Sequence, residues 1–511
     1  MVGEYRLGAL RKTGVMSMLA ITMLRLRRAR RLPSGDGGQR NVSLTNAGWR
    51  LIFVAAAAAI PFAASAQVST NVERAPTLTI ERYSEDWSWL ADPAKRKGDW
   101  AEPLKYIPLN DDGSIYLTTG LEARSRFEGY DNVNWGASPN DSYVWNRLMP
   151  YADLHVGNVR FFAMPILSGI SGTDRPKGPA DATGVDMLQA FVDVDFAVAG
   201  DDSLRLSAGR KLVSFGSGRF IDRRYGTGVP LPFDGFEAIY TGQTRQVTGF
   251  YLQPVDTRLG DFNDRRSRIK EVWGVYATQW LDATHLNGFD VYYIGLEDQN
   301  AVFDQGSGRQ LAHTFGSRIF GDNGTWYWNV EAAYQRGTFA GHQSEAWGAG
   351  FETRYRFRDT YLRPEIGLTA DVVSGDDDPN DPKLGTLNPL FPNGKYFGAL
   401  SPIGPRNLIH VRPSITVYPH ENVAVSLTGV AYWRQSTNDG IYSIPGFLVR
   451  SGKDSDARFV GKQIELGVSW QATPNLNVTG SLSAFQPGDF IRDTGSAQTI
   501  KMIGLQTTFR F

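Results

Sequence analysis

AQTIKMIGLQTTFRF, residues 497–511, alternates apolar and polar side chains. Every second residue back from Phe511 is Phe509, Thr507, Leu505 and Ile503, and the residues between them are mostly polar. A period of two residues predicts a β-strand with one apolar face. A strand of this kind that finishes on an aromatic ring is typical of the closing strand of an outer-membrane β-barrel. An edge strand of a soluble β-sandwich shows the same alternation and is the alternative interpretation.

The composition favours the barrel. The 511 residues include 55 glycines and 12% aromatic residues, but no cysteine, which excludes disulfides and thiolate metal sites. Beyond residue 66 no apolar run is long enough for a membrane-spanning helix. A transmembrane barrel fits these properties because only alternate residues of its strands face lipid.

Charge is distributed unevenly along the chain. Residues 1–66 hold ten Lys or Arg and two Asp or Glu, which leaves 43 basic and 51 acidic residues in the rest. A net-acidic body argues against nucleic acid as a partner.

The N-terminal region predicts export. Arg50 precedes the apolar run LIFVAAAAAIPFA, and Ala64-Ser65-Ala66 follows as an A-x-A cleavage site. Residues 1–66 are therefore interpreted as a basic leader plus a signal peptide cleaved after Ala66; a transmembrane anchor is the alternative. An exported chain without cysteine suits a Gram-negative envelope. Residues 67–113, rich in Trp and Pro without a clear period, are expected to form a periplasmic segment at the barrel mouth.

Residues 114–511 predict an all-β, antiparallel transmembrane barrel of about eighteen strands. The expected strands are 114–130, 142–156, 158–170, 183–198, 203–213, 233–241, 244–257, 270–280, 285–297, 309–321, 324–338, 344–357, 360–374, 407–418, 422–435, 459–471, 475–486 and 497–511. Short turns such as Gly157-Asn158 and Asp322-Asn323 alternate with longer connections such as 214–232 and 375–406. Short periplasmic turns alternating with long outer loops are typical of a bacterial barrel, and a soluble sandwich gives no reason for that alternation.

The alternation also assigns faces. The arginines expected on the inner wall, where they would form a substrate path, are Arg124, Arg126, Arg354, Arg356, Arg363, Arg412 and Arg434. Rings of Arg or Lys select anions in pores, and guanidinium groups match carboxylates in a bidentate way. Acids on the same wall offer the other interpretation, in which individual arginines serve only in ion pairs.

The connection 375–406 is the most distinctive irregular stretch. Asp376, Asp377 and Asp378 form a weak calcium candidate, but their spacing matches no EF-hand and a solvated acidic loop is the favoured interpretation. The apolar residues of this connection are too numerous for an idle loop and are expected to fold into the pore mouth as a constriction; they are Leu387, Leu390, Phe391, Tyr396 and Phe397.

SGDDDPNDPKLGTLNPLFPNGKYFG in this connection resembles the signature loop of the alginate export family of outer-membrane barrels. AGRKLVSFGSGRFIDRR followed by FDGFEAIY, WRQSTNDGIYSIPG and SDARFVGKQIELGVSWQ resemble further blocks of that family, in the same order. The resemblance covers roughly residues 114–511 and implies a monomeric eighteen-stranded barrel with an electropositive lumen that conducts a uronate polysaccharide. Within its motif, Arg210, Arg219, Arg223 and Arg224 are the candidate anion contacts that the resemblance implies.

The expected function is therefore an outer-membrane channel for an anionic polysaccharide or oligosaccharide, with export and import both open. A general or small-anion porin is the first alternative, and a polysaccharide-binding barrel is another. An enzyme is not expected, since no G-x-S-x-G elbow or H-E-x-x-H helix occurs and the six histidines lie mostly at predicted turns and strand ends. No cofactor is expected; the expected partners are the saccharide, outer-membrane lipid and periplasmic export or uptake machinery.

Overall fold

The computed structural model describes residues 78–511, except for the side chains of Lys395 and Tyr396. The predicted leader and signal peptide, residues 1–66, lie outside the described residues. All described residues belong to one compact unit. No helix among residues 78–511 is long and apolar enough to cross a membrane.

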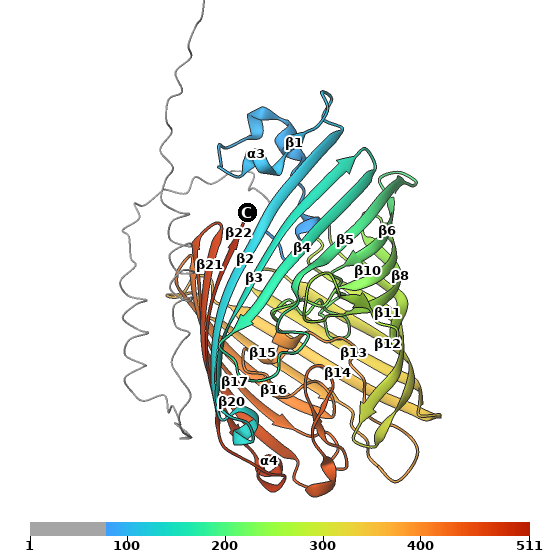
Figure 1. Ribbon diagram of the computed structural model, residues 1–511, viewed down its shortest axis with the longest axis vertical. Coiled ribbons are helices and arrows are strands. Elements are labelled where there is room, and N and C mark those ends of the chain that lie inside the picture. The colour runs from blue at the N-terminus through green and yellow to red at the C-terminus, as the bar shows by residue number, and fades with distance from the viewer. Residues whose placement is uncertain (1–77) are drawn as a thin grey trace, which may run out of the picture. The chain divides into compact units, whose positions relative to one another are not determined.

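Eighteen antiparallel strands form the wall of a closed barrel (Figure 1). They are β2 Ile115–Asp131, β3 Asp141–Val156, β4 Val159–Ser171, β5 Gly184–Ala197, β6 Ser203–Lys211, β7 Phe233–Thr241, β8 Arg245–Asp256, β10 Lys270–Trp280, β11 Gly288–Phe303, β12 Gly306–Asp322, β13 Trp326–Phe339, β14 His342–Arg356, β15 Glu365–Val373, β16 Leu408–His420, β17 Val423–Trp433, β20 Phe459–Thr473, β21 Leu476–Pro487 and β22 Ile500–Arg510. Each strand pairs with the next, and β22 pairs back to β2 from Glu122↔Arg510 to Asp131↔Lys501. The eighteen predicted strands and the all-β barrel class are confirmed.

Short strands and helical turns lie at the two ends of the barrel wall. Short strands β1 Ile107–Pro108 and β9 Arg265–Arg266 pair with β2 and β8, and β18 Ile441–Tyr442 pairs with β19 Leu448–Arg450. The helical turns are η1 Arg82–Ser84, η2 Ser88–Ala91, η3 Pro93–Lys95, α3 Glu102–Lys105, η4 Val133–Gly136, η5 Gly394–Phe397, η6 Gly452–Asp454 and α4 Asp489–Asp493. Figure 1 shows α3 and β1 at the end of the barrel that carries the short turns, and α4 at the end that carries the long loops.

The apolar alternation has the expected physical cause. On β14 the side chains of Trp347, Phe351 and Tyr355 are exposed on the outer surface, whereas Arg354 and Arg356 on the alternate positions bond to acids of the inner wall. Only lipid makes a continuous belt of exposed rings favourable, so the outer surface is built for a membrane.

One strand, β15, begins five residues later than the sequence predicted. The strand expected over 360–374 starts at Glu365, because Leu362 and Arg363 adopt positive φ angles of 62° and 43° and Pro364 follows them. These residues complete the turn after β14 instead of pairing with it. Arg363 therefore lies in this turn and not on a wall strand: the residue is exposed, its guanidinium lies over the ring of Tyr418, and a role in the substrate path stays a prediction.

The seam of the barrel is covered by the segment before β2. The pairing of β22 with β2 ends at Glu122, so the first residues of β2, from Ile115 onward, extend beyond their partner strand. β1 pairs with this free edge at Leu117 and Tyr116, and the Leu109 N–H donates to the Ile115 carbonyl at 2.8 Å. Unpaired backbone groups at a sheet edge are costly in or near lipid, and the segment satisfies several of them.

Candidate functional site: the lumen of the barrel

Two long connections fold into the barrel and pair with each other. They are residues 212–232, between β6 and β7, and residues 374–407, between β15 and β16; we call them the first and second inner loops. Ile221 and Phe391 form a parallel bridge, and the Asp222 N–H donates to the Phe391 carbonyl at 2.9 Å. The Phe391 N–H in turn donates to the Phe220 carbonyl at 2.8 Å. These hydrogen bonds satisfy backbone groups that the two loops bring into the interior.

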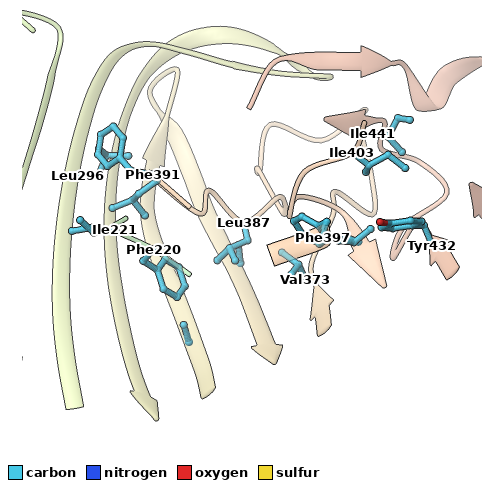
Figure 2. Packing of buried hydrophobic residues seen from close by; sticks show 14 of the residues in the cluster. Phe220, Ile221, Leu296, Val373, Leu387, Phe391, Phe397, Ile403, Tyr432 and Ile441 are labelled. Atoms are coloured by element: carbon cyan, nitrogen blue, oxygen red, sulfur yellow. The ribbon is translucent and has the colours of Figure 1, made fainter. Parts of the chain in front are cut away.

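An apolar cluster attaches the inner loops to the wall. Figure 2 shows Phe220, Ile221 and Phe391 beside Leu296 of β11, and Phe397 beside Tyr432 of β17. The cluster covers the inner face of β8 to β15 and, near the long loops, continues round to β22. The predicted constriction residues Leu387, Leu390, Phe391 and Phe397 are all buried in it, and the side chain of Tyr396 lies outside the described residues. Their effect on conductance stays a prediction.

A buried ion pair fixes the first inner loop to the same side of the wall. Arg219 lies 3.0 Å from Glu331 of β13 and 3.3 Å from Asp371 of β15. Gly350 of β14 makes room for this guanidinium, since a Cβ there would lie 2.5 Å from the Arg219 Nε and 2.2 Å from the Asp371 Oδ1. Removing one partner of such a pair leaves a buried charge uncompensated, so the contact locates the loop.

The segment before β2 fills another part of the lumen. The ring of Tyr83 packs edge-on against Phe162 and Phe191 of β4 and β5, and its hydroxyl donates to the Leu212 carbonyl at 2.9 Å. Glu81 forms an ion pair with Arg223 of the first inner loop. The segment that was expected at the barrel mouth thus lies inside the barrel at the short-turn end, where it contacts the first inner loop.

The space that remains is a cavity of about 750 Å³. On one side it meets Arg126 with the rings of Tyr130 and Trp145, and on another it meets the inner loops at Arg224 and Gly398. The opposite wall consists of small and hydroxyl-bearing residues of β17, β20, β21 and β22: Ala424, Ser426, Gly467, Ser469, Thr479, Ser481 and Gly504. We call this wall the hydroxyl wall. Arginine, aromatic rings and hydroxyl groups facing one cavity suit a charged, polyhydroxylated ligand.

Three arginines and two glutamates line this cavity: Arg126, Arg224, Arg412, Glu128 and Glu465. Arg126 pairs with Glu128, donates to the Gly226 carbonyl at 2.8 Å and lies 5.3 Å above the Trp145 ring. Arg224 donates to the Pro392 carbonyl at 3.3 Å, and its burial lowers the pKa of the guanidinium to about 10, which leaves it charged at neutral pH. Glu465 accepts from the Ala399 N–H at 2.8 Å and so anchors the second inner loop.

The other arginines predicted for the path have different places. Arg124 is buried, and its guanidinium donates to the Tyr225 and Thr227 carbonyls of the first inner loop. Arg356 bonds to Asp322 at 2.9 Å and to Glu365 at 2.7 Å near the short-turn end, and Arg354 lies 4.1 Å above the ring of Tyr327.

Arg434 corrects the sequence prediction. It follows the end of β17, is 0% exposed, and donates to the carbonyls of Ala457, Thr437 and Ser455. Its guanidinium lies 3.9 Å above the Phe490 ring of α4, and burial lowers its pKa to about 10. A guanidinium enclosed in this way organises the long loops and does not line an open path.

Most of the arginines of the sequence motif are also committed to ion pairs. Arg210 forms a bidentate pair with Asp234 at 2.7 and 3.0 Å, Arg219 pairs with Glu331 and Asp371, and Arg223 pairs with Glu81. Only Arg224 of these four lines the cavity. The motif therefore positions the first inner loop, and contact with a substrate stays a prediction for Arg224.

Comparison with known families fits this architecture. The family model described as "Alginate export" matches residues 115–504. The chain belongs to the alginate export family. No curated protein is detectably similar to it in sequence. With its closed strands and apolar outer surface, this member of the family is an outer-membrane β-barrel.

Solved structures share the fold of this barrel at low sequence identity. OccAB1 of Acinetobacter baumannii has a TM-score of 0.53 and 11% identity, covering 80% of this chain and 99% of its own. OccK2 (OpdF) of Pseudomonas aeruginosa, solved in complex with glucuronate, has a TM-score of 0.51 and 12% identity, covering 77% of this chain and 98% of its own. OccD3 (OpdP) of Pseudomonas aeruginosa has a TM-score of 0.51 and 10% identity, covering 77% and 91%.

The three aspartates of the calcium candidate do not come together. Asp376 is buried and its N–H donates to Asp439 at 3.1 Å, whereas Asp377 and Asp378 are exposed. Residues 78–511 contain no group of three or more His, Asp or Glu side chains that could hold a metal. Burial and the charge of Asp439 raise the pKa of Asp376 to about 7.

Sequence reasoning missed Tyr130, Trp145, Glu465 and the hydroxyl wall. The signal for the hydroxyl wall was present, because the inward positions of 463–483 are Ser, Thr, Gly, Gln, Asn and one Glu, where other strands carry Phe, Tyr and Leu. No signal of spacing could have joined Arg126 to Arg224, since a loop contact across 100 residues brings them together.

Proposed function

We propose that this barrel conducts an anionic saccharide of the uronate class along the hydroxyl wall. The observation that carries the proposal is the cavity in which Arg126, Arg224 and Arg412 face small hydroxyl-bearing residues. Guanidinium groups match sugar carboxylates, and the rings of Tyr130 and Trp145 offer flat faces to sugar rings. The short turns would lie on the periplasmic side and the long loops outside the cell, as in bacterial barrels with this asymmetry.

The inner loops assign the path to one side of the lumen. The second inner loop packs on β11 to β15 through apolar contacts and is also bonded to Glu465 of β20 through the Ala399 N–H, and its Gly398 and Ala399 border the cavity. For a chain of sugars to pass along the hydroxyl wall, the contact between Ala399 and Glu465 would have to open. Direction of transport depends on gradients and on envelope partners, and the wall sets only what passes.

A second candidate is a channel for single uronates or other small anions. The confined cavity favours it, because about 750 Å³ is a typical size for a site that holds one small molecule. A polymer would then need the inner loops to move.

Single-channel current in a planar bilayer tests the proposal. Alginate oligomers of increasing length are titrated against neutral oligosaccharides of equal length, with the protein processed after Ala66. Block that is specific to alginate, grows with oligomer length and weakens with salt is expected. Block by monomeric uronate that does not grow with length would favour the second candidate, and equal block by neutral sugars would reject both.

A further inference from the structure

A basic loop with no role in the lumen stands at the long-loop end of the barrel. Residues 257–269 connect β8 to β10, and we call them the arginine loop. It carries Arg258, Arg265, Arg266 and Arg268, all of them exposed. None of its residues lines the cavity described above.

The acids of the arginine loop are turned to other partners. Asp261 accepts from the Val185 N–H of β5 at 2.8 Å, and Asp264 accepts from the Arg258 N–H at 2.6 Å and from the Thr183 hydroxyl at 3.0 Å. Asp256 lies opposite Arg265 in the β8–β9 pairing but forms no ion pair with it. Within residues 78–511, no carboxylate lies within 4.0 Å of any of the four guanidinium groups.

Apolar side chains accompany this charge. Phe262 is 71% exposed and Leu259 is 54% exposed, although both belong to a loop whose backbone is fixed to the wall. The Phe262 N–H donates to the Val185 carbonyl at 2.9 Å, which holds the loop over the ends of the short strands β6 and β7. Exposed large apolar residues beside an apolar surface indicate contact with a partner or with lipid.

The outer wall beside the arginine loop is aromatic. Phe236 of β7, Tyr251 of β8 and Trp273 of β10 are register partners and form one row on the lipid-facing surface. Phe236 and Tyr251 are strongly exposed there. The exposed rings thus lie on β8 and β10, which the arginine loop connects, and on the neighbouring strand β7.

We propose that the arginine loop binds a phosphorylated, acylated lipid of the outer leaflet, with its guanidinium groups on the phosphates and Leu259 and Phe262 on the acyl chains. Arginine matches phosphate in a bidentate way, and a surface that joins unpaired arginines to apolar side chains is complementary to a lipid that carries both parts. If the arginine loop instead bound an anionic saccharide on its way to the pore, that ligand would explain the exposed arginines but not the exposed ring of Phe262. The inference rests on the orientation proposed above, with the long loops outside, and is independent of the transported saccharide.

Binding of purified diphosphorylated lipid A to the detergent-solubilised protein tests this inference. The variant Arg265→Gln/Arg266→Gln/Arg268→Gln is compared with the wild type and with Lys453→Gln/Lys462→Gln/Lys501→Gln. This control removes three exposed charges from other parts of the long-loop half. We expect the arginine variant to lose about tenfold or more in affinity, the lysine variant to change little, and lipid A without phosphates to bind weakly to all three proteins.

Several outcomes would overturn the inference. Equal binding of dephosphorylated lipid, or an equal loss in the two triple variants, would mean that no specific phosphate site exists. Competition by uronate oligomers at the same arginines would make the loop a collector of substrate instead. Mobility of heated and unheated samples on gels checks that each barrel is folded; if the triple variant does not fold, Arg266→Gln alone must show a loss relative to Lys453→Gln. Channel block by alginate is measured separately, so failure here leaves the transport proposal standing.

Discussion

The two sides of the lumen carry the same barrel wall but opposite interiors. On β8 to β15 the inward positions include Phe250, Leu252, Tyr276 and Tyr292, which pack against the inner loops. On β17 to β22 the corresponding positions toward the short turns are mostly Ser, Thr, Gly and Ala, and no inner loop covers them. The difference teaches that a wide barrel is narrowed by filling one side with an ordinary protein core, which leaves the other side to select what passes.

Charge follows the same division. On the filled side Arg219 and Arg356 each contact two acids, so their charge is balanced where it stands. Around the open cavity the arginines outnumber the acids, and the hydroxyl wall brings no charge. Counting arginines along the sequence therefore overstates the charge that a permeating anion meets.

The largest expected effect comes from breaking the filled side. Arg219→Met leaves Glu331 and Asp371 without their cation, which we expect to weaken attachment of the first inner loop by about 3–5 kcal/mol. The loop should then be cut more readily by proteases, and single-channel conductance should rise.

Arg205→Met is the matched control for this change. Arg205 pairs with Asp195 on the wall at the short-turn end, 2.7 Å away, and touches neither inner loop. Unchanged conductance and protease resistance in Arg219→Met would show that the apolar cluster alone holds the loop.

A smaller effect is expected from the open side. Arg412→Gln removes one charge from the cavity, and at about 1 kcal/mol or more for a confined charge the permeability ratio of anions to cations should fall several-fold. Arg356→Gln removes an equal charge from a position outside the cavity lining, so its reversal potential should move less. Equal shifts in the two variants would mean that both sides of the lumen contribute alike to selectivity.

A further expected effect concerns pH. The pKa of Asp376 is raised to about 7 in the folded loop, so the folded state holds a proton that the released loop gives up. Attachment of the second inner loop should therefore be firmest below about pH 4 and weaken as the pH rises from about 4 to 7. Hydrogen exchange of residues 374–407 at about pH 5 and pH 8 measures this, and Asp376→Asn should remove the difference. Burial also raises the pKa of Asp439, which accepts a hydrogen bond from the Asp376 N–H. Because Asp439 can therefore contribute to the same pH dependence, the variant Asp439→Asn is measured as well.

The sequence predicted the wall well because a wall position has only two choices, lipid or lumen. The alternation at Phe509 and Phe511 and the spacing of turns were enough for eighteen strands, and the largest error in a strand start, five residues before Glu365, depends on positive φ angles that composition does not reveal. The lumen was harder. Arg124, Arg126 and Arg412 lie on strands of the inner wall. The guanidinium of Arg124, however, donates its hydrogen bonds to carbonyls of a loop about 100 residues away in sequence. Where an inner loop lands is decided by tertiary packing, and alternation carries no information about it.

The covered seam bears on how the barrel is assembled. Glu122 of β2 accepts a hydrogen bond from Arg510 of β22, 388 residues later in the chain, so the first wall strand to leave the ribosome waits for the last. Contacts between residues so far apart in sequence form slowly, because the chain must lose the entropy of closing a long loop before any of these contacts can stabilise the fold. During that wait the segment from Trp87 to Leu109 can already occupy the outer edge of β2, since β1 and α3 contact it from the adjoining stretch of chain. When β1 already pairs with the start of β2, fewer backbone groups of β2 remain free to pair with a wrong strand. The stretch of β2 that stays free is the one with which β22 later pairs.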